Sequence, residues 1–171
     1  EGPAEDFTNK TKISKLLRFS STENSSPDQS QSLEDYVSRM KEGQKKIYYV
    51  AAENFKTALN SPYLEVFKKK GVEVLLLHDR IDDWLMSHLM EFDGKQLQDV
   101  AKGELDVNDL DTNEDENEDD EEITTKFKDL TDRISNYLNE YVEKTRVTNR
   151  LTDSPACLVV NEHDMGAQMR R

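Results

Sequence analysis

The sequence predicts an α/β fold, in which a small α/β/α unit of three layers is built on a short, mostly parallel sheet. Residues 47–52 and 72–77 are nearly continuous apolar runs rich in β-branched and aromatic side chains, as is typical of strands buried on both faces. About twenty residues of helical character join the two runs, enough for a right-handed crossover between parallel strands. We expect an acidic linker, a long helix and the start of a second α+β unit to follow.

The N-terminal part of the chain predicts two helices separated by a loop. Residues 6–17 place apolar side chains at roughly helical spacing with lysines on the other side, which predicts a short amphipathic helix. Residues 20–32 are rich in Ser, Asn, Gln and Asp and predict a mobile loop. Ser32 suits the N-cap of the second helix, and Gly43 is its expected stop.

Two further helices are predicted between the strands. Residues 54–60 form the first of them. Pro62 suits the first position of the next, which runs to Lys70. Gly71 is expected to end this helix in the left-handed conformation. The connection is therefore helical almost throughout.

The helix predicted over residues 79–89 carries more apolar side chains around its circumference than one buried face needs. Some of these side chains must be exposed. The lone tryptophan, Trp84, is either one of the exposed side chains or part of the core. Core packing and a binding surface remain open as alternatives for this helix. Gly94 lies beyond its end, and residues 97–100 predict a third strand.

An acidic segment separates this unit from the next. Residues 104–122 contain twelve acidic side chains and no basic one, and so carry most of the formal net charge of −13. We expect a hydrated linker, assigned to residues 103–122. The run from Asp111 to Glu122 matches the ligand positions of a calcium loop, but Glu116 stands where a glycine must make the turn. A solvated linker that binds divalent ions loosely is the preferred interpretation.

The last part of the chain begins a second unit. Apolar side chains recur every three to four residues over 123–141, which predicts one long helix with an apolar stripe. Residues 147–151 and 156–160 predict two strands, and 165–171 predict the start of another helix. The chain has no initiator Met and stops within this amphipathic stretch, so we expect a segment of a longer protein.

No pattern that would support catalysis occurs in the sequence. Motifs for phosphate-binding loops, nucleophile elbows and zinc-protease helices are absent, and the three histidines share no metal-ligand spacing. His78 with Asp79 and Asp82 is better explained as a helix start, where carboxylates complement the dipole. We therefore expect no catalytic residue, no metal and no cofactor within this chain.

The remaining composition argues against other partners and compartments. The single cysteine, Cys157, lies in an apolar run where a thiol packs well, and this usage suits a reducing cytoplasm. No apolar run is long enough for a membrane helix. Lysines at 45–46 and 68–70 lie near Tyr48 and Tyr49 and could suit nucleic acid, but lysines at a helix end and tyrosines in a strand are usually structural. We expect neither a membrane nor a nucleic-acid partner.

Five stretches resemble the heat-shock protein 90 chaperone family, with its bacterial high-temperature protein G branch nearest. They are LLRFSST (16–22), SLEDYVSRMKEGQKKIYYVAAENF (32–55), SPYLEVFKKKGVEVLLLHDRIDDWL (61–85), EFDGK (91–95) and RLTDSPACLV (150–159). The resemblance implies that residues 1–102 are the last part of the middle domain of the family. Residues 123–171 would then open its C-terminal domain, after the acidic linker at 103–122.

The resemblance also implies a binding site for client proteins. An exposed tryptophan of the family corresponds to Trp84, with Asp83 and Ser87 beside it on the same helix. A methionine pair on an amphipathic client helix corresponds to Met165 and Met169. Ser87 stands where a close relative carries Asn.

Two hypotheses for function follow. The first is a segment of an ATP-dependent stress-response chaperone that binds unfolded or partly folded clients, transmits domain motion and meets co-chaperones. The resemblance places the ATP and magnesium site, the catalytic arginine and the dimerisation helices outside this chain. We thus expect the segment to be a non-enzymatic monomer, although the full-length protein would be a homodimeric ATPase. The alternative is a free-standing acidic interaction or calcium-buffering module.

Overall fold

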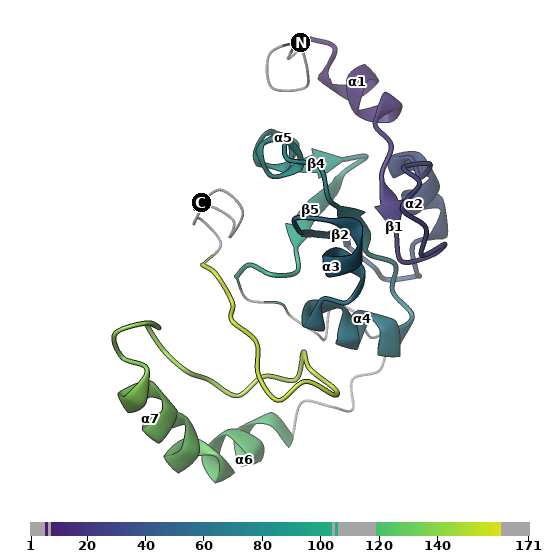
Figure 1. Cartoon of the computed structure of the whole chain (residues 1–171). Coiled ribbons are helices and arrows are strands. Elements are labelled where there is room, and N and C mark those ends of the chain that lie inside the picture. The colour runs from purple at the N-terminus through teal and green to yellow at the C-terminus, as the bar shows by residue number, and fades with distance from the viewer. Residues whose placement is uncertain (1–5, 7, 104, 106–118, 162–171) are drawn as a thin grey trace.

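A computed structural model describes residues 6, 8–103, 105 and 119–161 of the chain (Figure 1). The described residues form a mixed α/β structure around a five-stranded sheet with the strand order β1-β3-β2-β5-β4. The predicted α/β class is therefore confirmed. The strands are β1 (Ser20–Ser21), β2 (Lys46–Ala51), β3 (Leu75–Leu77), β4 (Glu91–Phe92) and β5 (Lys95–Asp99).

The central strand β2 runs parallel to both of its neighbours. Tyr49 lies opposite Leu75 of β3 on one side and Asp99 of β5 on the other. The predicted parallel pairing of the first two strands is confirmed. The two outer strands, β1 and β4, pair antiparallel with β3 and β5, so the sheet is mixed rather than mostly parallel.

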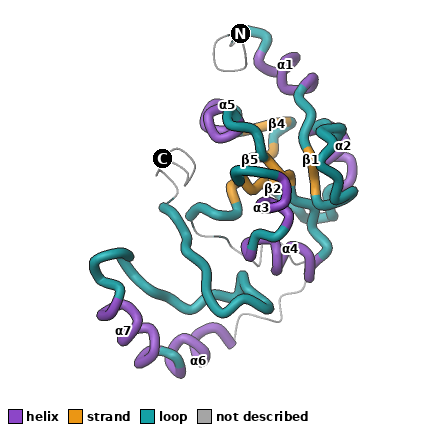
Figure 2. The backbone as a smooth tube through the Cα atoms, viewed as in Figure 1, coloured by secondary structure: helices purple, strands orange, loops and turns teal. Residues whose placement is uncertain are grey.

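Short helices surround the sheet (Figure 2). They are α1 (Lys10–Leu16), α2 (Leu33–Arg39), α3 (Phe55–Leu59), the 3-10 helix η1 (Pro62–Leu64), α4 (Glu65–Lys70) and α5 (Asp82–His88). Successive residues of a strand point to opposite faces, and β2 accordingly contributes to two cores. Tyr48 and Val50 pack with residues of α3, η1 and α4. Ile47 and Tyr49 pack with residues of α2 and α5.

Local signals for helix ends are correct at some positions and wrong at others. Ser32 accepts from the amide of Asp35, whose side chain accepts from the Ser32 amide in return, which completes a capping box at α2. Gly71 ends α4 at φ 62° as predicted. Gly43, however, does not stop α2, because Met40 already leaves the helical conformation.

Gly94 also has a different role from the predicted one. It forms the turn between β4 and β5 together with Asp93, and both residues have positive φ, 72° and 51°. Two such residues in succession are the pattern of a two-residue hairpin loop. This hairpin moves the third strand to 95–99, against the expected 97–100.

The predicted loop at 20–32 begins with a strand. Ser20 and Ser21 are fully buried and pair with β3 at the edge of the sheet. Phe19 and Gln31 then exchange both of their backbone hydrogen bonds, which closes the loop on itself. Composition indicated only a loop here, because two serines at an edge carry no strand pattern. The second predicted strand is also shorter than expected and spans 75–77 instead of 72–77.

The predicted long helix at 123–141 is two helices, α6 (Asp119–Lys126) and α7 (Lys128–Tyr137), shown in green in Figure 1. Hydrogen bonds continue through the break: the Phe127 amide donates to Ile123, and the Thr131 amide donates to Phe127. The interruption at Phe127 is thus a kink: hydrogen bonds continue across it, but the two helices run in different directions in Figure 1. Helix α6 begins inside the predicted linker.

The strands predicted at 147–151 and 156–160 are not formed. The described part of this region contains a single isolated bridge, between Lys102 and Val160. A strand needs a partner along its length, and the described residues around 147–160 offer none apart from this bridge. The described residues of the second unit are therefore helix and non-helical chain, and the predicted α+β arrangement is not confirmed by them. The helix predicted at 165–171 lies outside the described residues, and the domain boundaries stay predictions.

Candidate functional site

Helix α5 is fixed to the sheet by one apolar face. Leu85, Met86 and Leu89 are buried in the core that also contains Ile47 and Tyr49 of β2. The helix begins at Asp82, three residues later than predicted. A carboxylate oxygen of Asp82 accepts from the backbone amide of Asp79 at 2.9 Å, so this acidic start is structural, as expected.

Large apolar side chains on α5 and next to both of its ends are exposed to water. Trp84 is 42% exposed, Ile81 just before the helix is 66% exposed, and Met90 just after it is 71% exposed. We call these three residues the α5 surface. The open question of core or surface for Trp84 is thus answered in favour of partial exposure. The sequence signal, an excess of apolar residues, could not show that Ile81 and Met90 are also exposed.

Trp84 is held by the last turn of its own helix. Its indole ring stacks at a tilt on the His88 ring, with 4.8 Å between the ring centroids. Nδ1 of His88 lies 2.9 Å from the Trp84 carbonyl, and the Ser87 hydroxyl donates to the same carbonyl at 2.7 Å. Because a carbonyl oxygen only accepts, this contact requires a hydrogen on Nδ1 of His88. The predicted site residue Ser87 therefore turns its hydroxyl toward the backbone.

The predicted site residue Asp83 borders a second carboxylate. One of its oxygens, Oδ2, is buried with no hydrogen-bond partner among the described residues. Asp99 at the end of β5 is also buried, and burial raises its pKa to about 6, to which the charge of Asp83 adds. The Lys102 ammonium, 3.7 Å from Asp99, and the Ala101 amide partly offset this effect. Asp83 of α5 is thus close enough to Asp99 for their charges to interact, and Lys102 lies beside Asp99.

The other predicted site residues, Met165 and Met169, lie outside the described residues. The calcium-loop match from Asp111 to Glu122 cannot be located either, because its ligand side chains are outside the described part. Within the described residues, no group of three or more His, Cys, Asp or Glu side chains is placed to hold a metal ion. No described helix has the length and apolar character needed to cross a bilayer.

Several residues weighed for chemistry have structural surroundings. Nε2 of His78 lies 3.2 Å from the Ser20 hydroxyl, and its ring meets the edge of Phe55. Cys157 is half-buried, and burial raises the pKa of its thiol, which disfavours the reactive thiolate. Tyr48 and Tyr49 are buried in β2, as the structural interpretation predicted.

A second set of exposed apolar side chains follows α6 and α7. Ile123, Phe127, Leu130 and Ile134 recur at helical spacing, and none is buried. Ile123 also lines a cavity of about 330 Å³ with Leu105 and residues 146–150. The sequence predicted this stripe but not that it would face water.

Known proteins match the chain along its whole length. The family model described as "Hsp90 protein" matches residues 1–171. The "Chaperone protein HtpG" of Aromatoleum aromaticum (strain DSM 19018 / LMG 30748 / EbN1) is 55% identical over 171 residues, which is 100% of this chain and 26% of that relative. The chain thus spans about a quarter of the length of this relative. The family match covers every residue, and the chain therefore belongs to the Hsp90 family, in its bacterial HtpG branch.

Proposed function

We propose that this chain is the client-contacting segment of an ATP-dependent cytoplasmic chaperone, and that the α5 surface binds apolar stretches of unfolded or partly folded proteins. The observation that carries the proposal is the exposure of Ile81, Trp84 and Met90 around one short helix. Large apolar side chains left exposed on and around one short element are a feature of protein-binding surfaces.

The geometry of α5 suits binding without rearrangement. Its buried face ties the helix to the sheet, so the exposed side chains do not have to be ordered when a client arrives. Trp84 offers a large apolar area, and its stacking on His88 restricts the ring before contact. Tryptophan is also among the residues that most often dominate binding energy. Asp83 and Ser87, with Met165 and Met169, remain proposed members of this site.

The activity of the whole protein belongs to the same proposal. The matched relative is about four times as long as this chain, so the ATP and magnesium site and the dimer contacts of a homodimeric chaperone would lie elsewhere in such a protein. The described cavity of about 330 Å³ is lined by two arginines but by no glycine-rich loop and no carboxylate for magnesium. It does not fit a magnesium nucleotide, and we derive no step through ATP. No described feature favours the calcium-buffering alternative.

The test replaces Trp84 and a buried neighbour on the same helix. Trp84→Ala should weaken binding of a fluorescently labelled, permanently unfolded protein by at least about tenfold, measured by anisotropy. Its free energy of unfolding should change by less than about 1.5 kcal/mol, because the ring is already partly exposed. Leu85→Ala should instead cost about 2 to 5 kcal/mol and leave binding intact at low temperature. Unchanged binding by Trp84→Ala would remove the proposal.

Trp84 also reports on itself, as the single tryptophan of the chain. Its emission should be that of a partly hydrated indole and should shift to shorter wavelength when the unfolded protein is added. Emission that does not respond to saturating client would count against contact at this residue.

A further inference from the structure

Glu65, the first residue of α4, receives a set of hydrogen bonds from the far end of the chain. Its carboxylate accepts from the backbone amides of Thr152 at 2.7 Å, Asp153 at 2.9 Å and Ser154 at 3.1 Å. The Ser154 hydroxyl donates to it as well. Four donors from three consecutive residues therefore converge on one carboxylate. None of these contacts was anticipated from the sequence.

Three successive amides, from Thr152 to Ser154, donate to the same carboxylate. Consecutive amides in a turn form a concave site that favours an anion. The Ser154 hydroxyl, followed by the amides, lowers the pKa of Glu65 to about 2. The carboxylate is consequently charged at neutral pH.

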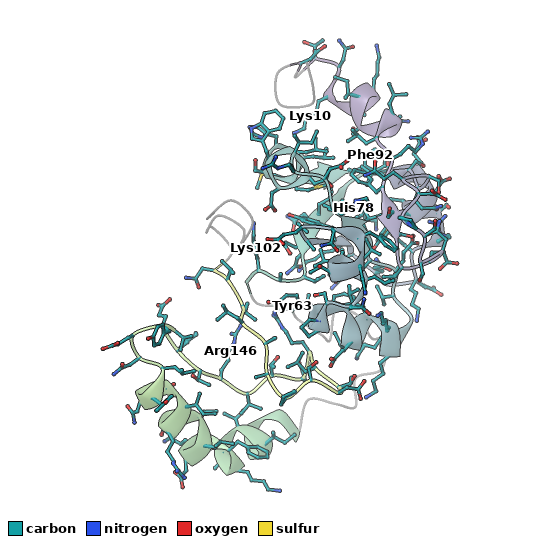
Figure 3. The ribbon with its side chains drawn as sticks, in the orientation of Figure 1. Lys10, Tyr63, His78, Phe92, Lys102 and Arg146 are labelled. Atoms are coloured by element: carbon teal, nitrogen blue, oxygen red, sulfur yellow. The ribbon has the colours of Figure 1, made fainter. Side chains whose placement is uncertain are left out.

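The residues next to Glu65 are buried in the core. The residues around it in η1 and α4, namely Leu64, Val66 and Phe67, are fully buried in the core beneath the sheet. Tyr63, two residues earlier in η1, donates its hydroxyl to the carbonyl of Leu158 and lies beside the C-terminal segment in Figure 3. The contacts from η1 and α4 thus reach both halves of residues 150–160.

The same segment is attached at a second place. Gly103 donates to the carbonyl of Val160 at 2.9 Å, and Val160 donates to Ala101 at 3.3 Å. The guanidinium of Arg150 donates to the carbonyl of Gly103 at 3.0 Å. Helix α7, by comparison, has no buried residue. In the described part of the chain, residues 150–160 are therefore the main attachment of the C-terminal region to the sheet.

We propose that Glu65 is a positioning residue: it locks residues 150–160 onto the sheet unit and so fixes the α6–α7 region relative to the α5 surface. Domain motion would be transmitted through this contact between Glu65 and residues 152–154, and that role rests on the proposed chaperone function. The contact itself does not depend on client binding. The two ideas can therefore fail separately.

The first experiment compares Glu65→Gln with Glu73→Gln in the whole 171-residue chain. Glu73 is the matched control, because its carboxylate pairs with Arg39 at 2.8 Å within the sheet unit and does not touch residues 150–160. Amide exchange followed by NMR should become at least about tenfold faster at residues 152–154 in Glu65→Gln. Strands β2 and β3 should exchange as in the wild type, and Glu73→Gln should leave 152–154 protected. Equal protection of 152–154 in both variants would overturn the proposal, as would faster exchange throughout the sheet of Glu65→Gln.

Two further measurements separate a lock from an ordinary surface contact. The carboxyl carbon signal of Glu65 should titrate near pH 2 in the wild type, and Ser154→Ala should move this pKa upward. A wild-type titration near the usual 4.5 would mean that the lock is not formed. Spin labels on α4 and α7 should give a narrow distance distribution that broadens in Glu65→Gln and not in Glu73→Gln. Glu65→Gln should still bind unfolded protein, since the α5 surface is untouched; a binding defect confined to Trp84→Ala concerns the proposed function alone.

Discussion

Phe67 and Phe127 are the same side chain in two parts of one molecule, with opposite surroundings. In the sheet unit, Phe67 is completely buried and packs on Tyr48 with 4.9 Å between ring centroids. In the C-terminal helical region, Phe127 is 41% exposed. Tyr36 of α2 and Tyr137 of α7 repeat the contrast, at 1% and 86% exposure. Amphipathic pattern alone therefore does not bury a side chain.

The difference comes from what lies opposite each helix. The sheet presents an apolar row on each face, because β2 and β3 alternate their side chains between the two cores. Helices α2, α4 and α5 each pack against one of these rows. No comparable surface faces α7 within the described residues, and its apolar stripe is left in water. A helix gains most of its stability from such packing.

The largest expected effect is on the two phenylalanines. Phe67→Ala should lower the free energy of unfolding by about 3 to 5 kcal/mol, because it empties a fully buried site and removes the ring contact with Tyr48. Phe127→Ala should cost less than about 1 kcal/mol. Urea denaturation followed by circular dichroism measures both. Comparable losses in the two variants would mean that α7 is packed in solution, and the contrast between the regions would disappear.

What the sequence could predict follows the same division. The buried strands at 47–52 and 72–77, their parallel pairing and the caps at Ser32 and Gly71 depend on local patterns, and the structure confirms them with shifted ends. The edge strand β1 could not be found, because its serines are strand residues only through pairing with β3. Residues 147–160 carry a strand-like pattern but lack a partner in the described chain.

The second effect concerns pH and the sheet unit alone. Asp99 is buried, and its pKa is raised from 3.8 to about 6, so the folded chain binds a proton that the unfolded chain has released between these values. Its contribution to stability is therefore fully present below about pH 3.8 and is lost as the pH rises through about 6. The loss amounts to about 2 to 3 kcal/mol.

The measurement is the difference in unfolding free energy between the wild type and Asp99→Asn from pH 3.5 to 7.5. As the pH rises, the wild type should lose stability relative to the variant, because Asp99 ionises and Asn does not. Asp129→Asn, on exposed α7, is the control and is measured over the same pH range. A flat difference for Asp99→Asn would show that its carboxyl is not perturbed by burial.

The candidate site was only partly accessible to sequence reasoning. An excess of apolar residues over 79–89 indicated that something in this helix is exposed, but not that Ile81 and Met90 flank Trp84 in water. Exposure depends on which face meets the sheet, and that is decided by distant residues such as Ile47. The Glu65 contacts join residues 87 positions or more apart, and no local pattern signals them.

The smallest effect compares the two tyrosine hydroxyls. The hydroxyl of Tyr36 donates to the Glu73 carbonyl at 2.7 Å and accepts from the Tyr48 amide and the Gln44 side chain, each at 3.1 Å. Burial raises its pKa, so it stays protonated and keeps donating at neutral pH. Tyr36→Phe removes the hydroxyl that links α2 to β2 and should lower the free energy of unfolding by about 1 to 3 kcal/mol. Tyr137→Phe should cost close to nothing, because water already solvates that hydroxyl. The measurement is the midpoint temperature of thermal unfolding of the two variants. Equal shifts would mean that the buried hydrogen bonds of Tyr36 add nothing beyond the packing of its ring. The contrast between the two regions would then come from apolar packing alone.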